Sequence, residues 1–198
     1  SCVAASEQYW FNHYQTKDGL PSNTIYAVVQ DKYNFIWVAT RDGICRFDGR
    51  GFVKLGDDSP NGLTSGMTPA LCMDDEGGLW FANGNGVGCY NIDTGKTQSL
   101  GGLEENDIRY ICQDAAGNIW FLSSNMYRYN KASGVVSKYM AADYFAPASI
   151  TADSFGTIWV SSVSGDLYRY DSRTDQFELQ EQNGIKSKIG RASCRERV

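Results

Sequence analysis

The sequence contains one histidine, His13, and no pair of cysteines at the Cys-x-x-Cys spacing. Zinc sites depend on Cys and His ligands at such short spacings, so the sequence predicts no metal site. His13 also lacks a Ser or Cys partner in a recognisable phrase, and the paired acids Asp57-Asp58 and Glu104-Glu105 stand in connecting loops. Nucleophilic catalysis and glycoside hydrolysis both need such groups brought together, and we therefore predict no catalytic residue and no cofactor.

Positive charge is in the minority, with 18 Lys and Arg residues against 23 Asp and Glu residues and a formal net charge of −5. No basic stripe is present, which argues against nucleic acid as a partner. No apolar run is long enough to span a bilayer, and no stretch has the period of an amphipathic helix. Residues 84–88 (GNGVG) lack the Lys-Ser/Thr pair and the helix of a phosphate-binding loop.

What the sequence does contain is a phrase that occurs four times. In each copy an Asp lies six residues before a Trp, a Gly or Asn lies three before it, and Ile or Leu directly precedes it. The tryptophans are 43, 40 and 39 residues apart, which is the spacing of a repeat architecture. The four copies of this Asp–Trp phrase are DKYNFIW (31–37), DDEGGLW (74–80), DAAGNIW (114–120) and DSFGTIW (153–159).

Each Asp–Trp phrase predicts a turn followed by a strand. The Asp side chain caps the turn, and the positive φ that the turn needs comes from Asn34, Gly77, Gly117 and Gly156. Ile-Trp or Leu-Trp then begins a strand, and polar and aromatic residues alternate in later stretches such as YRYN and LYRYD. Four short antiparallel strands in about 40 residues is the content of one β-propeller blade. The predicted fold is therefore all-β, a propeller with four four-stranded antiparallel blades.

A residue that recurs in every blade is expected to serve the architecture rather than a reaction. We assign this structural role to the repeated positions, which are Asp31, Trp37, Asp74, Gly77, Trp80, Asp114, Gly117, Trp120, Asp153, Gly156 and Trp159. Cys72 and Cys112 each lie eight residues before their Trp, a position that suits a packed apolar side chain. Cys45 and Cys89 are likewise expected to be buried free thiols, with disulfides left open.

These phrases resemble the repeat of the two-component regulator propeller family. The similarity covers about residues 10–180 and is strongest in WFNHYQTKDGLPSNTIYAVVQDKYNFIWVATRDGICRFDG (10–49). The resemblance implies the periplasmic sensor region of a hybrid two-component histidine kinase, on a propeller of the seven-bladed type. It further implies an oligosaccharide ligand, more blades, a membrane segment and a kinase in the same chain, and a homodimer of the intact receptor. The four blades would then be an incomplete arc, and the parent rather than this fragment would be the enzyme.

The two ends of the sequence differ in composition from the repeats. Val3-Ala4-Ala5 fits the small-residue pattern before a signal-peptidase cut, so residues 1–5 are expected to be a signal-peptide remnant. Residues 189–198 (IGRASCRERV) can be written in the codons of a common sequencing adapter and are expected to be an artefact. Without them the net charge becomes −7, because three Arg and one Glu are lost. The propeller region is then 6–188, and its end blades are expected to expose apolar faces that favour association.

A ligand site is expected on one face of the propeller. The turns between second and third strands share this face with the connections between blades, and Arg, Asp and Asn there suit sugar hydroxyls while aromatic rings can stack on a sugar. The candidate ligand-binding residues are Arg41, Asp42, Asn83, Asn85, Asn125, Tyr144 and Phe145. The alternative is that they are ordinary turn residues.

Two functional classes fit the sequence. One is an extracytoplasmic sensor that responds to a glycan fragment and signals to transcription. The other is a secreted propeller enzyme, such as a polysaccharide lyase or hydrolase, or a carbohydrate- or protein-binding module. The continuation after Lys188 distinguishes them, because a sensor needs further blades and a membrane span of about 20 residues. The lack of gathered acids, His and Tyr in four blades favours the sensor.

Overall fold

The computed structural model of the chain describes residues 10–56, 66–84, 86–101, 103, 107–139 and 146–180. These residues form four antiparallel sheets of four strands each, numbered blade 1 to blade 4 along the chain, and one short 3-10 helix, η1 (Thr16–Asp18). No helix in the described ranges is long and apolar enough to cross a membrane. The predictions for residues 1–5 and 189–198 lie outside the described residues.

Each blade is a meander in which consecutive strands pair. Blade 1 contains β1 (Ile25–Gln30), β2 (Ile36–Thr40), β3 (Gly43–Phe47) and β4 (Phe52–Lys54). Blade 2 contains β5 (Ala70–Met73), β6 (Gly78–Asn83), β7 (Gly86–Asn91) and β8 (Lys96–Leu100). Blade 3 contains β9 (Tyr110–Gln113), β10 (Ile119–Leu122), β11 (Met126–Asn130) and β12 (Val135–Tyr139). Blade 4 contains β13 (Pro147–Ala152), β14 (Ile158–Ser162), β15 (Leu167–Asp171) and β16 (Gln176–Leu179).

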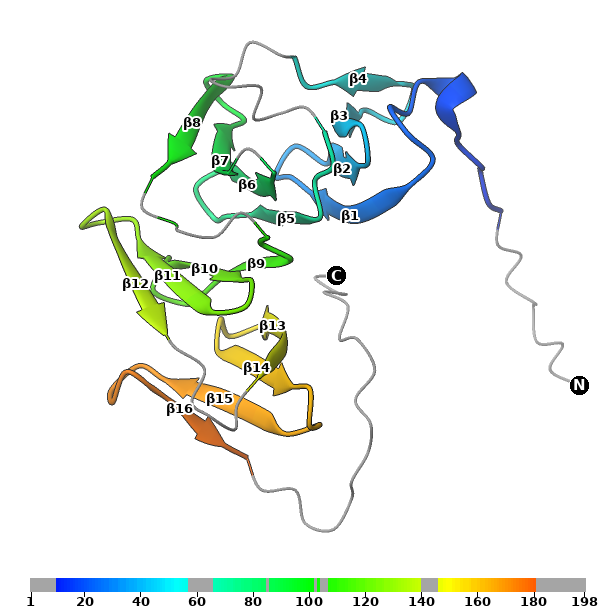
Figure 1. Ribbon diagram of the computed structural model, residues 1–198. Coiled ribbons are helices and arrows are strands. Elements are labelled where there is room, and N and C mark those ends of the chain that lie inside the picture. The colour runs from blue at the N-terminus through cyan, green and yellow to red at the C-terminus, as the bar shows by residue number, and fades with distance from the viewer. Residues whose placement is uncertain are drawn as a thin grey trace, which may run out of the picture.

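The first strand of each blade is the innermost one. β1 contacts β5, β5 contacts β9 and β9 contacts β13, so the first strands follow one another along the inside of the molecule. Figure 1 shows blades 1 and 4 at the two ends of an open arc, with blades 2 and 3 between them. The all-β propeller architecture predicted from the sequence is confirmed, and the total number of blades in the intact propeller stays a prediction.

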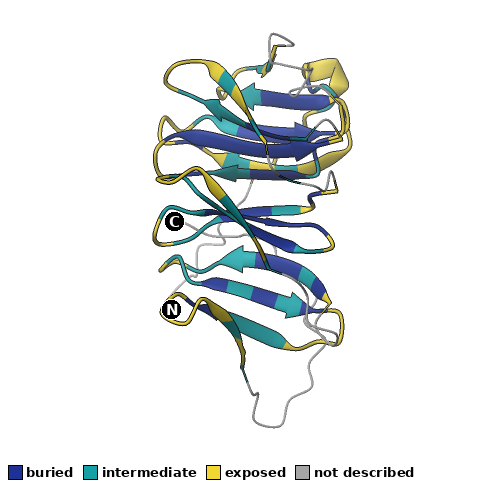
Figure 2. Cartoon of the chain, turned by 60° about the vertical axis from the view of Figure 1, so that its left-hand side comes forward, coloured by how far each residue is buried: buried dark blue, intermediate teal, exposed yellow. Residues whose placement is uncertain are grey.

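The tryptophan of each of the first three blades packs against the blade that follows. The ring pairs are Trp37–Tyr90, Trp80–Tyr129 and Trp120–Tyr170, with centroids 5.5, 5.6 and 4.7 Å apart. Each pair lies in an apolar cluster shared by two neighbouring blades. Figure 2 shows buried residues mainly in the second strands of the blades and exposed residues at the turns, and β1 contains no buried residue. We call the surface that a blade turns toward the next blade its forward face, and the opposite surface its back face.

The Asp–Trp phrase forms the same turn in every blade. In blade 1, Oδ1 of Asp31 accepts the backbone N–H groups of Tyr33 and Phe35, while Oδ2 accepts the indole N–H of Trp37 at 2.8 Å. Asp74, Asp114 and Asp153 make the equivalent bonds in the other blades. The predicted left-handed residue is also present, with φ of 66°, 86°, 81° and 75° at Asn34, Gly77, Gly117 and Gly156.

The four cysteines in the described region are free thiols, as expected, but only Cys45 and Cys112 are buried, while Cys72 and Cys89 are half-buried. Cys72 lies beside Trp80 on the neighbouring strand, and Cys112 lies beside Trp120 in the same way. Cys45 is fully buried, and burial raises the pKa of its thiol to about 11. Burial, together with the charge of Asp74, raises the pKa of the Cys89 thiol to about 12.

Candidate functional site

The turns between the second and third strands do lie beside the connections between blades. The backbone N–H of Thr68, in the connection to blade 2, donates to the carbonyl of Thr40 in blade 1 at 3.2 Å. In blade 4 the N–H of Val163 donates to the carbonyl of Ala146 at 2.9 Å. These bonds join a second–third turn to the chain that enters a blade. We call this surface the turn–linker face.

A buried polar residue lies three positions after the Trp of each blade, at the end of the second strand or, in blade 3, directly after it. These residues are Thr40, Asn83, Ser123 and Ser162, exposed by at most 5%. Oγ1 of Thr40 donates to the carbonyl of Gly43 and accepts the N–H of Asp42. Oγ of Ser162 accepts the N–H of Asp166 at 3.0 Å. The buried polar side chain therefore forms hydrogen bonds with the backbone of the turn, and the residues that follow it are exposed to solvent.

The structure separates the predicted ligand-binding residues into three groups. Arg41 and Asp42 are exposed in the turn between β2 and β3. Asn125 is half-buried, and its backbone N–H donates to Oγ of Ser123 in the turn between β10 and β11. Asn83 is 3% exposed, so its side chain is positioned to support the turn rather than to meet a ligand. The remaining predicted residues, Asn85, Tyr144 and Phe145, lie outside the described residues.

Arg109 is a residue of this face that the sequence reasoning missed. It is exposed directly before β9, and its guanidinium donates to the carbonyl of Ser123 at 2.8 Å, beside Asn125. On blade 4 the hydroxyl of Ser164 donates to Oδ2 of Asp166 at 2.6 Å, and both residues are exposed. The turn–linker face therefore offers guanidinium, hydroxyl and carboxylate groups, which together can donate to and accept from a polyhydroxylated ligand.

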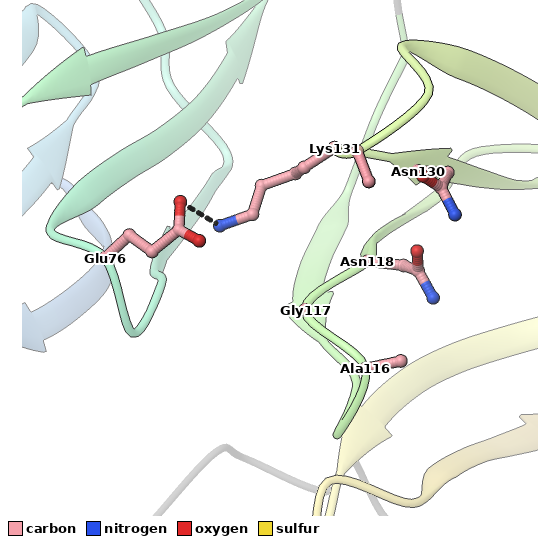
Figure 3. A pocket seen from close by; sticks show the side chains of 7 residues that line it. Glu76, Ala116, Gly117, Asn118, Asn130 and Lys131 are labelled. Carbon is pink, nitrogen blue, oxygen red and sulfur yellow. Dashed lines mark ion pairs between the residues drawn. The ribbon is translucent and has the colours of Figure 1, made fainter.

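The opposite face carries the Asp–Trp turns and the turns between third and fourth strands. A shallow hollow of about 260 Å³ lies there between blades 2 and 3. Figure 3 shows Lys131 extending from blade 3 toward Glu76 of blade 2, while Asn118 and Asn130 lie on the blade 3 side. No aromatic ring is among the residues that line the hollow. The hollow is thus a polar seam between blades rather than a sugar-stacking site.

Lys131 ties the two blades together electrostatically. Its Nζ lies 3.0 Å from Oδ2 of Asp74 and 3.0 Å from Oε2 of Glu76. Burial alone would lower the pKa of Lys131, but its hydrogen bonds to Glu76 and Asp74 outweigh burial and raise it. Burial would likewise raise the pKa of Asp74, yet hydrogen bonds from Trp80, Gly78 and Lys131 lower it overall. Both groups are therefore held in their charged forms and serve the contact between blades.

Fold and surface together define the class of this protein: an open β-propeller arc with a repeated Asp–Trp turn on one face and a polar turn–linker face on the other. Residues 19–42 and 102–125 match the family model described as "Two component regulator propeller". Both matches begin at a Gly-Leu pair before an inner strand and end in a second–third turn. The resemblance predicted from the sequence is confirmed for these two segments, which match the two-component regulator propeller repeat.

A histidine kinase and several solved structures are similar to parts of this chain. A histidine kinase from Formosa agariphila is 35% identical over 65 residues, which are 33% of this chain and 5% of that protein. Among solved structures, the extracellular domain of a protein named as a one component system from B. thetaiotaomicron superposes with a TM-score of 0.71 at 22% identity. The match covers 84% of this chain and 25% of that chain. The chain therefore spans a small part of the length of these relatives.

The same fold also occurs in an enzyme. Virginiamycin B lyase from Staphylococcus aureus superposes with a TM-score of 0.66 at 16% identity, over 82% of this chain and 57% of that chain. A catalytically inactive form of that lyase carries a histidine-to-alanine substitution. The one histidine here, His13, is exposed and precedes blade 1. At 22% and 16% identity, the similarities to the B. thetaiotaomicron domain and to the lyase show the fold alone.

Proposed function

We propose that this chain is the ligand-sensing propeller region of a hybrid two-component sensor histidine kinase, located in the periplasm. The observation that carries the proposal is the in-register series of four Asp–Trp blades, two of which match the regulator propeller model. The identity to a named histidine kinase supports the same reading. In this proposal the chain contributes binding, and the longer parent contributes phosphoryl transfer, dimerisation and output to transcription.

We further propose that the ligand is a glycan-derived oligosaccharide bound on the turn–linker face. Arg41 and Asp42 on blade 1 and Arg109 and Asn125 on blade 3 provide donors and acceptors on two separate blades. A short oligosaccharide that bridges them would bind one arrangement of the blades better than another. Such a difference in affinity is what a ligand needs in order to shift a conformational equilibrium. The candidate aromatic residues Tyr144 and Phe145 would add stacking in the connection before blade 4.

The test is a binding titration with defined oligosaccharides released from neutral and uronic-acid-containing polysaccharides. Calorimetry on the chain should find at least one oligosaccharide that binds, and a double variant Arg41→Ala, Asp42→Ala should weaken that binding by about tenfold or more. The matched control is Asn130→Ala on the opposite face, which should leave the affinity unchanged. Equal affinity in both variants would place the site elsewhere. Conversion of an oligosaccharide or of a streptogramin B antibiotic to product would instead identify a propeller enzyme.

A further inference from the structure

A carboxylate of the chain itself fills the contact between blades 3 and 4. Oδ1 of Asp175, in the turn between β15 and β16, lies 2.8 Å from Nη1 of Arg128 on β11. It also accepts the hydroxyl of Tyr139 at 2.6 Å and that of Tyr170 at 2.5 Å. Asp175 has a φ of 56°, a left-handed conformation that is uncommon outside glycine. One guanidinium and two phenols therefore hold a carboxylate between these two blades.

The contact between blades 1 and 2 is built on the same plan. An Arg stands beside the Trp on the forward face of the first blade, and a Tyr on the back face of the next blade packs on that Trp. These residues are Arg46, Trp37 and Tyr90 between blades 1 and 2, and Arg128, Trp120 and Tyr170 between blades 3 and 4. The residue directly before the fourth strand differs, because it is Asp175 in blade 4 but Gly95 in blade 2. Blade 2 therefore provides the phenol without the carboxylate.

Two rings are also lacking in the contact between blades 1 and 2. Leu55 stands at the position of Tyr139, and Thr97 at that of Phe177, which packs on Trp120. A hollow of about 230 Å³ lies here, and its lining includes Trp37, Arg46, Val53, Leu55 and Tyr90. No Asp or Glu is among the described residues that line it. The hollow therefore combines an apolar wall with a positive charge.

Arg46 is held by aromatic rings rather than by an acidic partner. Its guanidinium carbon lies 4.4 Å from the centroid of the Phe35 ring and 6.0 Å from that of Trp37. Among the described residues it forms no hydrogen bond or ion pair, whereas Arg169, at the same position in blade 4, lies 3.5 Å from Glu178. Stacking orients a guanidinium but leaves its N–H groups available. Arg46 can therefore donate to a ligand in the hollow.

Tyr90 supplies a second donor from the neighbouring blade. Its hydroxyl would lie 3.8 Å from a Cβ placed on Gly95, so it stands where a carboxylate at that position would meet it. Within the described ranges this hydroxyl has no hydrogen-bond partner of its own. The bond between Tyr170 and Asp175 shows what such a phenol does when a carboxylate is present.

We propose that this hollow is a binding site for a small aromatic carboxylic acid. The carboxylate accepts from Arg46 and Tyr90, as Asp175 accepts from Arg128 and Tyr170, and the ring lies against the apolar wall of the hollow. The acid thus brings from solution a carboxylate and a ring, the two groups that the chain supplies between blades 3 and 4. Hydrogen bonds between a guanidinium and a carboxylate are charge-assisted and strong. The site shares no residue with the oligosaccharide site proposed above and is independent of it.

A titration of benzoate into the full chain tests the proposal, with the indole N–H resonance of Trp37 as the readout. The resonance should shift and saturate, and Arg46→Met should weaken the affinity at least about tenfold, because a hydrogen bond between charged groups is lost. The matched control is Arg169→Met at the same position in blade 4, which should leave the affinity unchanged. Benzamide, which has the ring without the charge, should bind at least about tenfold more weakly than benzoate.

A second variant supplies the carboxylate from the chain. Gly95→Asp copies the residue of blade 4, and Asp is compatible with the site because Asp175 has a similar φ, 56° against 70°. This variant should abolish benzoate binding. Gly134→Asp, in the corresponding turn of blade 3, should leave the binding unchanged, because blade 2 presents Cys89 where blade 1 presents Arg46.

The proposal is overturned if benzoate causes no saturable shift of Trp37, or if Arg46→Met binds benzoate as tightly as the parent chain does. Benzoate binding that survives Gly95→Asp also overturns it. Tighter binding of galacturonate than of benzoate at this hollow does the same, because the ligand would then be a sugar acid rather than an aromatic one.

Discussion

The indole Nε1 of Trp80 donates a 2.8 Å hydrogen bond to Oδ2 of Asp74, six residues earlier, and both side chains are buried. The other three blades repeat this bond at 2.8, 2.8 and 2.9 Å. One carboxylate thus closes a turn through its Oδ1 atom and fixes the edge of the ring that fills the blade interface through its Oδ2 atom. The Asp–Trp phrase couples turn formation to packing between blades.

Asp74→Asn should therefore destabilise the chain by about 1–3 kcal/mol, although it is nearly isosteric. The amide can keep one oxygen for the turn, but its NH2 group then faces the indole donor and the ammonium of Lys131. Urea unfolding followed by far-UV circular dichroism measures the loss. A control, Asp75→Asn, changes an exposed carboxylate next to it and should cost less. Equal losses for the two variants would mean that the indole bond contributes nothing.

The contribution of Asp74 should also depend on pH. Hydrogen bonds from Trp80, Gly78 and Lys131 outweigh burial and hold its pKa below the ordinary 3.8 in the folded state. A carboxyl group whose pKa is lowered by folding stabilises the protein fully above 3.8, and this stabilisation is lost as the pH falls through the folded value. The difference in unfolding free energy between the parent and Asp74→Asn should accordingly narrow below pH 3.8. A difference that stays constant down to the acid transition would contradict this.

Gly156 is expected to be less replaceable than Gly117, although both have a positive φ, 75° and 81°. A Cβ at Gly156 would lie 2.5 Å from the backbone N of Ala115 in blade 3, whereas one at Gly117 would meet nothing closer than 3.7 Å. Ala at either site bears the cost of the left-handed conformation, about 1 kcal/mol. Gly156→Ala should cost a further 1–3 kcal/mol, roughly, because blade 4 must move away from blade 3. Denaturant midpoints of the two variants decide the matter, and equal midpoints would refute the close approach.

Lys131→Met should weaken the contact between blades 2 and 3 by about 1–2 kcal/mol, because Lys131 is mostly buried and pairs with the buried Asp74. The ion pair between blades 1 and 2, Lys32 with Asp93, is the matched control. Both of its side chains are well exposed, so Lys32→Met should leave the unfolding midpoint unchanged. At high salt, Lys131→Met should still destabilise the chain more than Lys32→Met does. Similar midpoint shifts in the two variants would show that burial is irrelevant here.

The sequence was sufficient for the blades because each one repeats the same local signals. Asp74 and Gly77 can be recognised as turn residues from spacing alone, since the turn is made within five residues. The indole bond was not predicted, because it depends on how β6 begins after the turn. Arg109 was missed for a different reason: it stands in a phrase, IRY, that the other blades do not repeat, so periodicity carries no information about it.

The ligand face shows the same limit. Spacing placed Arg41 and Asp42 in an exposed turn, but it could not distinguish them from Asn83, whose side chain is turned inward at the strand end. Burial at the end of β6 is a tertiary property, and the residue three positions after the Trp is buried in all four blades.

The cysteine thiols should react slowly in the folded chain. The thiolate is the reactive form of cysteine, and burial holds the pKa of Cys45 and Cys89 at about 11 and about 12. At pH 8 only about one Cys45 in a thousand is then a thiolate, even before steric exclusion. In a chain carrying Cys2→Ser and Cys194→Ser, a maleimide should label the fully buried Cys45 only at the rate of unfolding. Unfolding without reductant should release all four remaining thiols, whereas fewer than four would reveal a disulfide and contradict the packing of free cysteines beside the tryptophans.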